Sequence, residues 1–301
     1  MGKSRKPKQE ERFFEQDLSQ TEDKPGKVFI IHLLMEKKCK MPEQEAMTAI
    51  MNKHLGETEC FSYSEKSAGF CPKKYKVHSE KKNVDLSPQL MIMGCSKIKQ
   101  PVMDVFASSQ LWDCEDGEEI LDECGYQVMA TDMLASVLNY KDRAEMLVEY
   151  VEALAEMFPS CRAVVFDTSK KMITREAIME CTMPKESRFI HYAVNVIFFS
   201  IQGSDDKIVD TLGMSALFLP DLQYHFNGMH HDFVVEHAYN LLSYIYDNEN
   251  PIESEDHVDG IEDGEMSPNV QWKVRYENSL VQPAMMVIDV DMGEYAAGIR
   301  D

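Results

Sequence analysis

The sequence lacks a long apolar run. Its longest apolar stretch, Phe189 to Ile201, is interrupted by His191, Asn195 and Ser200. A membrane-spanning helix needs about 20 consecutive apolar residues, so we expect no membrane association. The N-terminus also lacks the apolar core of a secretory signal peptide, and a cytoplasmic location is therefore expected.

Paired cysteine spacings and complete catalytic motifs are also missing. The eight cysteines form no C-x-x-C pair, and in a chain without a secretory signal they indicate reduced, mostly buried thiols. The 14 glycines contain neither G-x-x-x-x-G-K nor G-x-G-x-x-G, which disfavours the two common kinds of phosphate loop. Gly213-Met-Ser215 begins like a nucleophile elbow, but Leu217 occupies the position of its second glycine. These gaps leave no complete catalytic motif and no implied cofactor.

Positive charge is scarce. The chain has 31 Lys and Arg against 52 Asp and Glu, which gives a formal net charge of −21. Repulsion from phosphates disfavours nucleic-acid binding, and no basic patch is visible after residue 26. The acidity suits a basic protein partner, and a merely solvated acidic surface is the alternative interpretation.

The chain is organised as a polar leader and one folded domain. Residues 1–26 are polar and mixed in charge, and we expect them to form a flexible leader that ends at Pro25-Gly26. Residues 27–301 are expected to form a single α+β domain, with mixed, partly antiparallel sheets and helices packed on one face. Strand, loop, amphipathic helix and strand occur in the same order twice, so the domain is also expected to consist of two related α/β halves, 27–183 and 187–301.

Apolar periodicity places the individual elements. Helices are predicted at 42–54, 101–111, 140–158, 174–179 and 232–246. Strands are predicted at 28–34, 59–64, 74–79, 88–94, 125–130, 162–166, 189–201, 270–276 and 283–290. The clearest helix is Tyr140 to Phe158, because its apolar residues recur every three or four positions and Pro159 ends it.

Two segments contain acidic residues and no Lys or Arg. Residues 113–123 hold seven acids and are predicted to be an exposed loop or a frayed helix end. Residues 247–266 hold nine acids, with Pro251 and two glycines, and are predicted to be a solvated loop. Neither segment matches the spacing of an EF-hand, so only weak association with cations is expected.

The densest group of metal-ligating residue types lies in the second half of the chain. Asp221, His225, His231 and His237 fall within a short stretch, and histidine with carboxylate is a ligand set for divalent Zn or Fe. The spacing does not fit the known helical metal motif. His230, His231 and Asp232 also stand where a helix should begin, so a capped helix start preceded by a polar loop is the alternative.

A second candidate site is a cleft near Asp210, Gly213, Pro220 and Asp221. Gly213 is expected to permit a tight turn, and Pro220 to end a strand or helix. Asp221 is expected either to cap a turn or to point into the cleft, where Asp210, His225 and His231 could converge with it.

The stretch Asp210-Thr-Leu-Gly-Met-Ser-Ala-Leu-Phe-Leu-Pro-Asp-Leu222 resembles a bacterial family of unknown function, domain family 4261. The helix through Ala238–Tyr244 is similar to one that the family carries downstream. The resemblance is best over residues 187–301 and extends plausibly from residue 27. Phe218 stands where a small residue is expected. Because the family has no assigned reaction, the resemblance implies a bacterial cytoplasmic source and no catalytic role.

Two functional hypotheses follow from the sequence. The first is a non-catalytic binding protein with an acidic surface, whose partner is a basic protein. The second is a metal-assisted, hydrolase-like enzyme built on the His/Asp cluster at residues 221–237.

Overall fold

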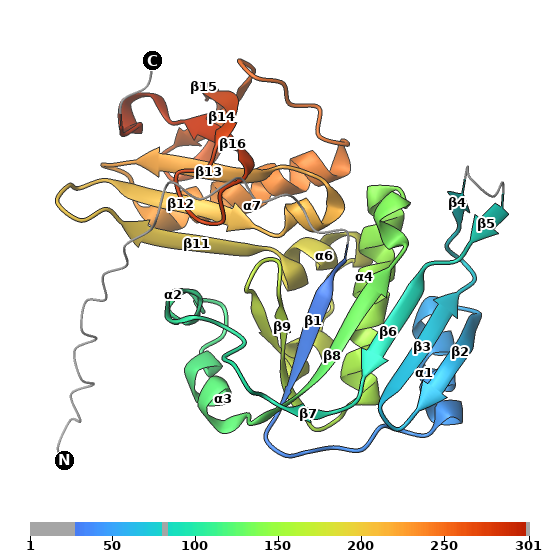
Figure 1. Cartoon of the computed structure of the whole chain (residues 1–301). Helices are drawn as coiled ribbons and strands as arrows, with labels where there is room; N and C mark the ends of the chain where they lie inside the picture. The colour runs from blue at the N-terminus through green and yellow to red at the C-terminus, as the bar shows by residue number, and fades with distance from the viewer. Residues whose placement is uncertain (1–27, 80–83, 299–301) are drawn as a thin grey trace, which may run out of the picture.

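The computed structural model describes residues 28–79 and 84–298, and within them the strands form two large sheets and a short ribbon (Figure 1). The fold is α+β, as predicted from the sequence. The predicted leader, 1–26, lies outside the described residues. Among the helices of the described chain, none combines the length and the apolarity needed to cross a bilayer.

The first sheet occupies the N-terminal part of the described chain. Its strand order is β10-β9-β1-β8-β6-β3-β2, with β7 paired to β8, and these neighbours are antiparallel. The strands are β1 (Ile30–Met35), β2 (Thr58–Ser64), β3 (Ser67–Pro72), β6 (Gln89–Met93), β7 (Ser96–Lys97), β8 (Tyr126–Met133), β9 (Cys161–Phe166) and β10 (Met172–Thr174). The ribbon of β4 (Val77–Ser79) and β5 (Val84–Leu86) projects from it.

The long helices of this part cover one face of the first sheet. In β1, Ile31 and Leu33 point toward α1 (Gln44–Leu55) and α4 (Tyr140–Met157) and are fully buried in the same core cluster. The side chain of Asn139 accepts a hydrogen bond from the Lys141 backbone N–H at 2.9 Å and caps α4. The α5 helix (Arg175–Met179) also packs against α4, while α2 (Val105–Ser108) and α3 (Gly117–Glu123) belong to a separate apolar cluster on the other face.

The second sheet has the strand order β11-β12-β13-β16-β15-β14. Its strands are β11 (Asn195–Ser200), β12 (Lys207–Leu212), β13 (Asp221–Phe226), β14 (His257–Glu262), β15 (Glu265–Asn278) and β16 (Met286–Asp291). The β13–β16 pair is parallel and the other pairs are antiparallel. The α7 helix (His231–Asp247) packs on one face, and α6 (Lys185–Ala193) lies between α4 and α7. Short 3-10 turns occur at η1 (Ala135–Val137), η2 (Met214–Leu217) and η3 (Gly293–Tyr295).

The two sheets share a building plan. In the first, β1 leads through α1 to the edge strand β2, and β3, β6 and β8 return to the neighbour of β1. In the second, β13 leads through α7 to the edge strand β14, and β15 and β16 return to the neighbour of β13. The second sheet has one strand fewer between its edge strand and the strand that pairs with β13. The last strand therefore runs in the opposite sense: β16 is parallel to β13, whereas β8 is antiparallel to β1. The order of elements agrees with two related halves, and their common origin remains a prediction.

The prediction of one long strand over 189–201 is wrong. The chain forms α6 up to Ala193 and only then β11. Within α6, Phe189, Ile190 and Tyr192 are buried while Lys185 and Glu186 are exposed. The apolar end of an amphipathic helix therefore runs directly into an apolar strand, and together they resembled one continuous strand.

The prediction of a solvated loop over 247–266 is also wrong in its second part, which forms β14 and the start of β15. Asp263 and Gly264 make the two-residue turn, and both have positive φ (54° and 86°). Asp-Gly between two strands is the strongest short signal for a hairpin, and the density of acids obscured it. The acidic segment 113–123 contains α3, and the predicted helix 101–111 is reduced to the single turn of α2.

A buried ion pair stands where the two sheets meet. Asp132 in β8 accepts hydrogen bonds from the Phe29 backbone N–H (2.6 Å) and from Arg143 Nη2 in α4 (3.0 Å). Both side chains are almost completely buried. The Arg143 guanidinium also lies 5.4 Å from the ring centre of Phe218, which follows η2 in the second half. One side-chain pair therefore connects β1, β8 and α4 with the second half.

We expect Arg143→Ala to lower the free energy of unfolding by about 3–5 kcal/mol, because it leaves the Asp132 carboxylate buried without its cationic partner. Denaturant titration followed by circular dichroism measures the loss. The double variant Asp132→Asn/Arg143→Met keeps an acceptor for Phe29 and removes both charges, so it should recover most of the lost stability. A double variant as unstable as Arg143→Ala would contradict this account.

Candidate functional site

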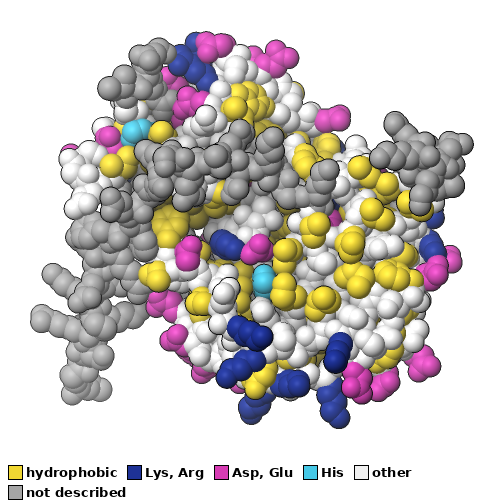
Figure 2. Space-filling model, in the orientation of Figure 1, with side chains coloured by type: hydrophobic (Ala, Val, Ile, Leu, Met, Phe, Trp, Pro, Cys, Tyr) yellow, Lys and Arg dark blue, Asp and Glu magenta, His cyan; other side chains and the backbone are white. Residues whose placement is uncertain are grey.

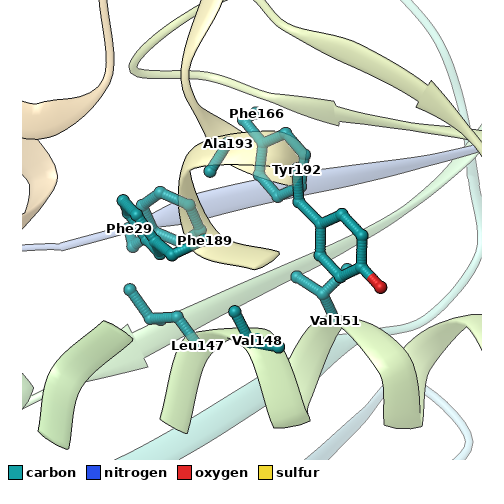
Figure 3. Close-up of a pocket in the computed structure, with 8 residues that line it drawn as sticks. All are labelled: Phe29, Leu147, Val148, Val151, Phe166, Phe189, Tyr192 and Ala193. Carbon is teal, nitrogen blue, oxygen red and sulfur yellow. The ribbon is translucent and has the colours of Figure 1, made fainter. Parts of the chain in front are cut away.

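A small cavity in the core is too small to bind a ligand. It lies beside β1, α4 and α6 and is lined by Phe29, Leu147, Val148, Val151, Phe166, Phe189, Tyr192 and Ala193 (Figure 3). Its volume is about 10 Å³, close to the minimum for one water molecule, and an apolar cavity of this kind stays dry. The Tyr192 hydroxyl donates to Glu152 at 3.3 Å instead. The cavity is a packing defect of the core.

Polar side chains cross the middle of the second sheet in one row. Asp210 in β12 pairs with Gln223 in β13, and Gln223 pairs with Asp289 in β16. All three are at most 2 % exposed. Gln223 donates to Asp289 at 3.4 Å and accepts from the Leu280 backbone N–H at 2.6 Å. The loop that contains Leu280 therefore closes over this row.

Asp221 holds the turn that precedes its own strand. Its carboxylate accepts hydrogen bonds from the backbone N–H groups of Met214 (3.1 Å) and Ser215 (3.3 Å) and from the Thr211 hydroxyl (3.2 Å). Burial raises the pKa of Asp221 to about 6, although the backbone hydrogen bonds act in the opposite direction. Of the two roles expected for Asp221, the structure shows the cap of a turn.

The predicted cleft is instead a closed turn. Gly213 has φ 137°, and a Cβ atom there would lie 2.5 Å from the carbonyl oxygen of Ala193, so this tight turn requires glycine. Pro220 stands between η2 and β13. Asp210 lies close enough to Asp221 for the two charges to interact, and burial together with that charge raises the pKa of Asp210 well above its ordinary value. Its Oδ1 atom has no hydrogen-bond partner among residues 28–79 and 84–298.

The four predicted metal ligands, Asp221, His225, His231 and His237, do not converge. His237 is buried in α7, where its Nδ1 lies 2.9 Å from the Tyr224 hydroxyl and its Nε2 lies 2.7 Å from the Asp259 carbonyl oxygen. A carbonyl oxygen only accepts, so Nε2 carries the proton and Nδ1 accepts from Tyr224. Burial also lowers the pKa of His237. The Nε2 atom of His225 in β13 lies 3.4 Å from Oδ2 of Asp206. The Asp221 carboxylate already accepts hydrogen bonds from the turn that it caps.

The structure brings His231 together with its own neighbours. Within the described part of the chain, His230, His231 and Asp232 form the group whose ligand atoms lie within 4.8 Å of one another. His230 and His231 stack with ring centres 4.6 Å apart, and His231 stacks on Phe198 of β11 at 4.2 Å. The His230 side chain accepts a hydrogen bond from the Asp232 backbone N–H at 3.4 Å, so His230 caps α7.

A pocket that the sequence did not indicate lies beside α7. It has a volume of about 240 Å³ and is bounded by α7 on one side and by the β14–β15 hairpin on the other. Its lining residues are Phe233, Glu236, His237, Asn240, Ile261, Gly264, Glu265 and Met266. We call this pocket the hairpin groove.

The hairpin groove combines acidic and aromatic groups. Glu236 and Glu265 are exposed, and Phe233 is 42 % exposed. The Phe233 ring packs on the turn, since a Cβ atom at Gly264 would lie 3.0 Å from it. The neutral, doubly hydrogen-bonded His237 contributes no positive charge. The groove can therefore accommodate a cationic group between carboxylates and an aromatic ring.

Comparison with known families decides the assignment of this part of the chain. Residues 210–291 match the model of DUF4261, a domain of unknown function. The predicted resemblance is thus confirmed over residues 210–291, whereas its extension toward residue 27 and a bacterial source remain predictions. No curated protein and no solved structure matches the chain significantly. The DUF4261 segment runs from Asp210 in β12 to the end of β16, and it contains the buried polar row, α7 and the hairpin groove.

We expect Asp210→Asn in the DUF4261 segment to stabilise the protein at pH 7 by roughly 1–3 kcal/mol, the scale of burying a polar group without a partner. The folded-state pKa of Asp210 is raised, so folding is penalised as the pH rises above the unfolded value of about 3.9. The gain should therefore shrink toward pH 4. Chemical denaturation at pH 7 and pH 4 measures it, and a destabilised variant at pH 7 would refute this account.

Proposed function

We propose that this chain is a non-catalytic binding protein that engages a basic protein partner through the hairpin groove. The observation that carries the proposal is the pocket of about 240 Å³ lined by Glu236, Glu265 and Phe233. A lysine or arginine side chain of the partner would place its positive charge between the carboxylates of Glu236 and Glu265. The aliphatic stem of the lysine, or the guanidinium of the arginine, would pack against the Phe233 ring.

The charge of the surroundings supports this choice of partner. Three further acids are exposed and are close in sequence to residues that line the groove. They are Glu262 and Asp263 at the hairpin tip and Asp232 at the start of α7. The chain as a whole carries a net charge of −21. Such a field accelerates the approach of a basic partner and makes the binding sensitive to salt.

We expect Glu236→Gln/Glu265→Gln to weaken binding of a hexa-arginine peptide at least tenfold, because the two carboxylates that face the cation lose their charge. Isothermal titration calorimetry at about 50 mM salt measures the affinity. The matched control is Glu119→Gln/Asp122→Asn, which removes the same charge from two exposed residues of α3 that do not line the hairpin groove. The control should keep most of the affinity.

Equal losses in the groove variant and the control would show that net charge alone attracts the peptide, and the hairpin groove would then not be the site. Affinity that does not change between 50 and 500 mM salt would contradict the proposal as well. Phe233→Leu separates the aromatic contribution, and we expect it to reduce affinity a few-fold with no change in charge.

The His230–His231–Asp232 group favours a second candidate, a metal-dependent enzyme. Two imidazoles and a carboxylate are suitable ligands for Zn²⁺ and leave a coordination position open. Elemental analysis of protein purified without a histidine tag should then show about one metal per chain, lost in His230→Ala/His231→Ala. A metal content at background level would remove this candidate.

A further inference from the structure

The helices of the described residues leave one face of the first sheet largely uncovered. Val128 and Ala130 of β8 point toward α1 and α4, so the residues that alternate with them in β8, and their partners in β6, point to the opposite side. Figure 1 is viewed onto this side, and Figure 2 shows hydrophobic side chains spread across it. We call this surface the open face, and it includes Phe61, Met91, Met93, Met129, Thr131 and Met133.

The open face is apolar and contiguous. Met93 is 50 % exposed, Met133 is 44 % exposed and Phe61 is 41 % exposed. Met91 pairs with Gly69 in β3 and with Thr131 in β8. A Cβ atom at Gly69 would lie 2.4 Å from the Phe61 ring and 3.0 Å from the Met91 sulfur, so both side chains pack over this glycine. Methionine-rich exposed surfaces of this kind are typical of protein docking sites.

Lysines gather at one end of the open face. Lys37, Lys38 and Lys40 follow β1, while Lys97 and Lys99 lie in and after β7. The two segments meet because Met35 and Lys97 both pair with Tyr126, and the Cys39 N–H donates to Cys95 Sγ at 3.3 Å. All five lysines are exposed, and none forms an ion pair with another described residue. Figure 2 shows dark blue side chains at the lower edge of the face.

This lysine rim corrects the expectation that no basic patch follows residue 26. The five lysines come from segments more than 50 residues apart in the sequence. Only the pairing of β1 and β7 with β8 brings them together.

The part of the same sheet face formed by β1 and β9, next to the open face, is covered by a helix of the chain itself. There α3 packs Ile120, which is 2 % exposed, against Leu34 and Val165 on the same side as the open face. Its acids face outward, and Glu123 pairs with Arg162 at 3.0 Å. An acidic amphipathic helix therefore already covers one strip of this layer.

We propose that the open face docks an acidic amphipathic helix of a partner protein, which continues the layer begun by α2 and α3. The helix would bury its apolar stripe on the methionines and Phe61 and direct its carboxylates toward the lysine rim. This site is independent of the hairpin groove, which carries the opposite charge and lies on the other sheet. With both sites occupied, the chain would bridge a basic and an acidic partner.

The probe is an 18-residue helical peptide with leucines on one face and glutamates on the other, added to the full chain labelled with ¹³C at its methionine methyl groups. We expect saturable shifts concentrated on Met91, Met93, Met129 and Met133. Lys37→Gln/Lys38→Gln/Lys97→Gln/Lys99→Gln should weaken binding at least tenfold, and so should Met93→Asp/Met133→Asp. A circular dichroism spectrum and a thermal unfolding midpoint close to those of the unmodified chain would show that these variants are folded.

Several outcomes would overturn the proposal. The first is that a control peptide with lysines in place of the glutamates binds as tightly as the acidic peptide. The second is that the acidic peptide shifts the methyl signals of methionines outside the open face, or shifts no methionine signal. Concentration-dependent dimerisation abolished by Met93→Asp/Met133→Asp, measured by analytical ultracentrifugation, would identify a second copy as the occupant. Binding of vesicles with anionic lipid through the lysine rim, without peptide binding, would identify a membrane surface.

Discussion

The buried pair of Asp132 and Arg143 is the constraint on which the arrangement of the two sheets depends. Asp132 fixes the entry to β1 through the Phe29 N–H, and Arg143 fixes α4 and reaches Phe218 beyond η2. Farther along the interface, the Tyr140 hydroxyl of α4 donates to the carbonyl oxygen of Tyr246 in α7. Removing one partner of such a pair would leave an uncompensated buried charge, so the pair links the elements that it contacts.

Acidic residues serve opposite purposes inside the protein and on its surface. Burial raises the pKa of Asp210 well above its ordinary value and that of Asp221 to about 6. Asp221 compensates by accepting backbone hydrogen bonds, while one oxygen of Asp210 finds no partner in the described part of the chain. Surface acids such as Glu236 and Glu265 keep their hydration and contribute to the field that a partner meets. A count of net charge does not distinguish these two groups, and only the second can take part in recognition.

The sequence pattern was sufficient to predict an element where apolar residues recur with a single period along the segment. The apolar stripe of α4 and the turn at Gly213 with its capping Asp221 were predictable, because each depends on neighbours in the chain. The α6–β11 junction was missed because two apolar segments with different periods join without a polar break. The β14–β15 hairpin was missed because its Asp263-Gly264 turn signal lies within a run of acids. The hairpin groove exists only because of that hairpin, so a sequence pattern that hides the hairpin also hides the groove. The histidines that the sequence places close together are separated by the fold.

The lysine rim shows why surface chemistry is harder to infer than fold class. Two short basic segments gain meaning only after the register of β1, β7 and β8 places them beside each other. The same register turns Met91 and Met129 to the side opposite α1 and α4, since a shift by one residue would exchange the two faces of a strand. In a chain with a net charge of −21, this local group of lysines next to exposed methionines departs from the overall composition. The five lysines lie beside exposed apolar side chains of the first sheet, and this juxtaposition supports a docking role.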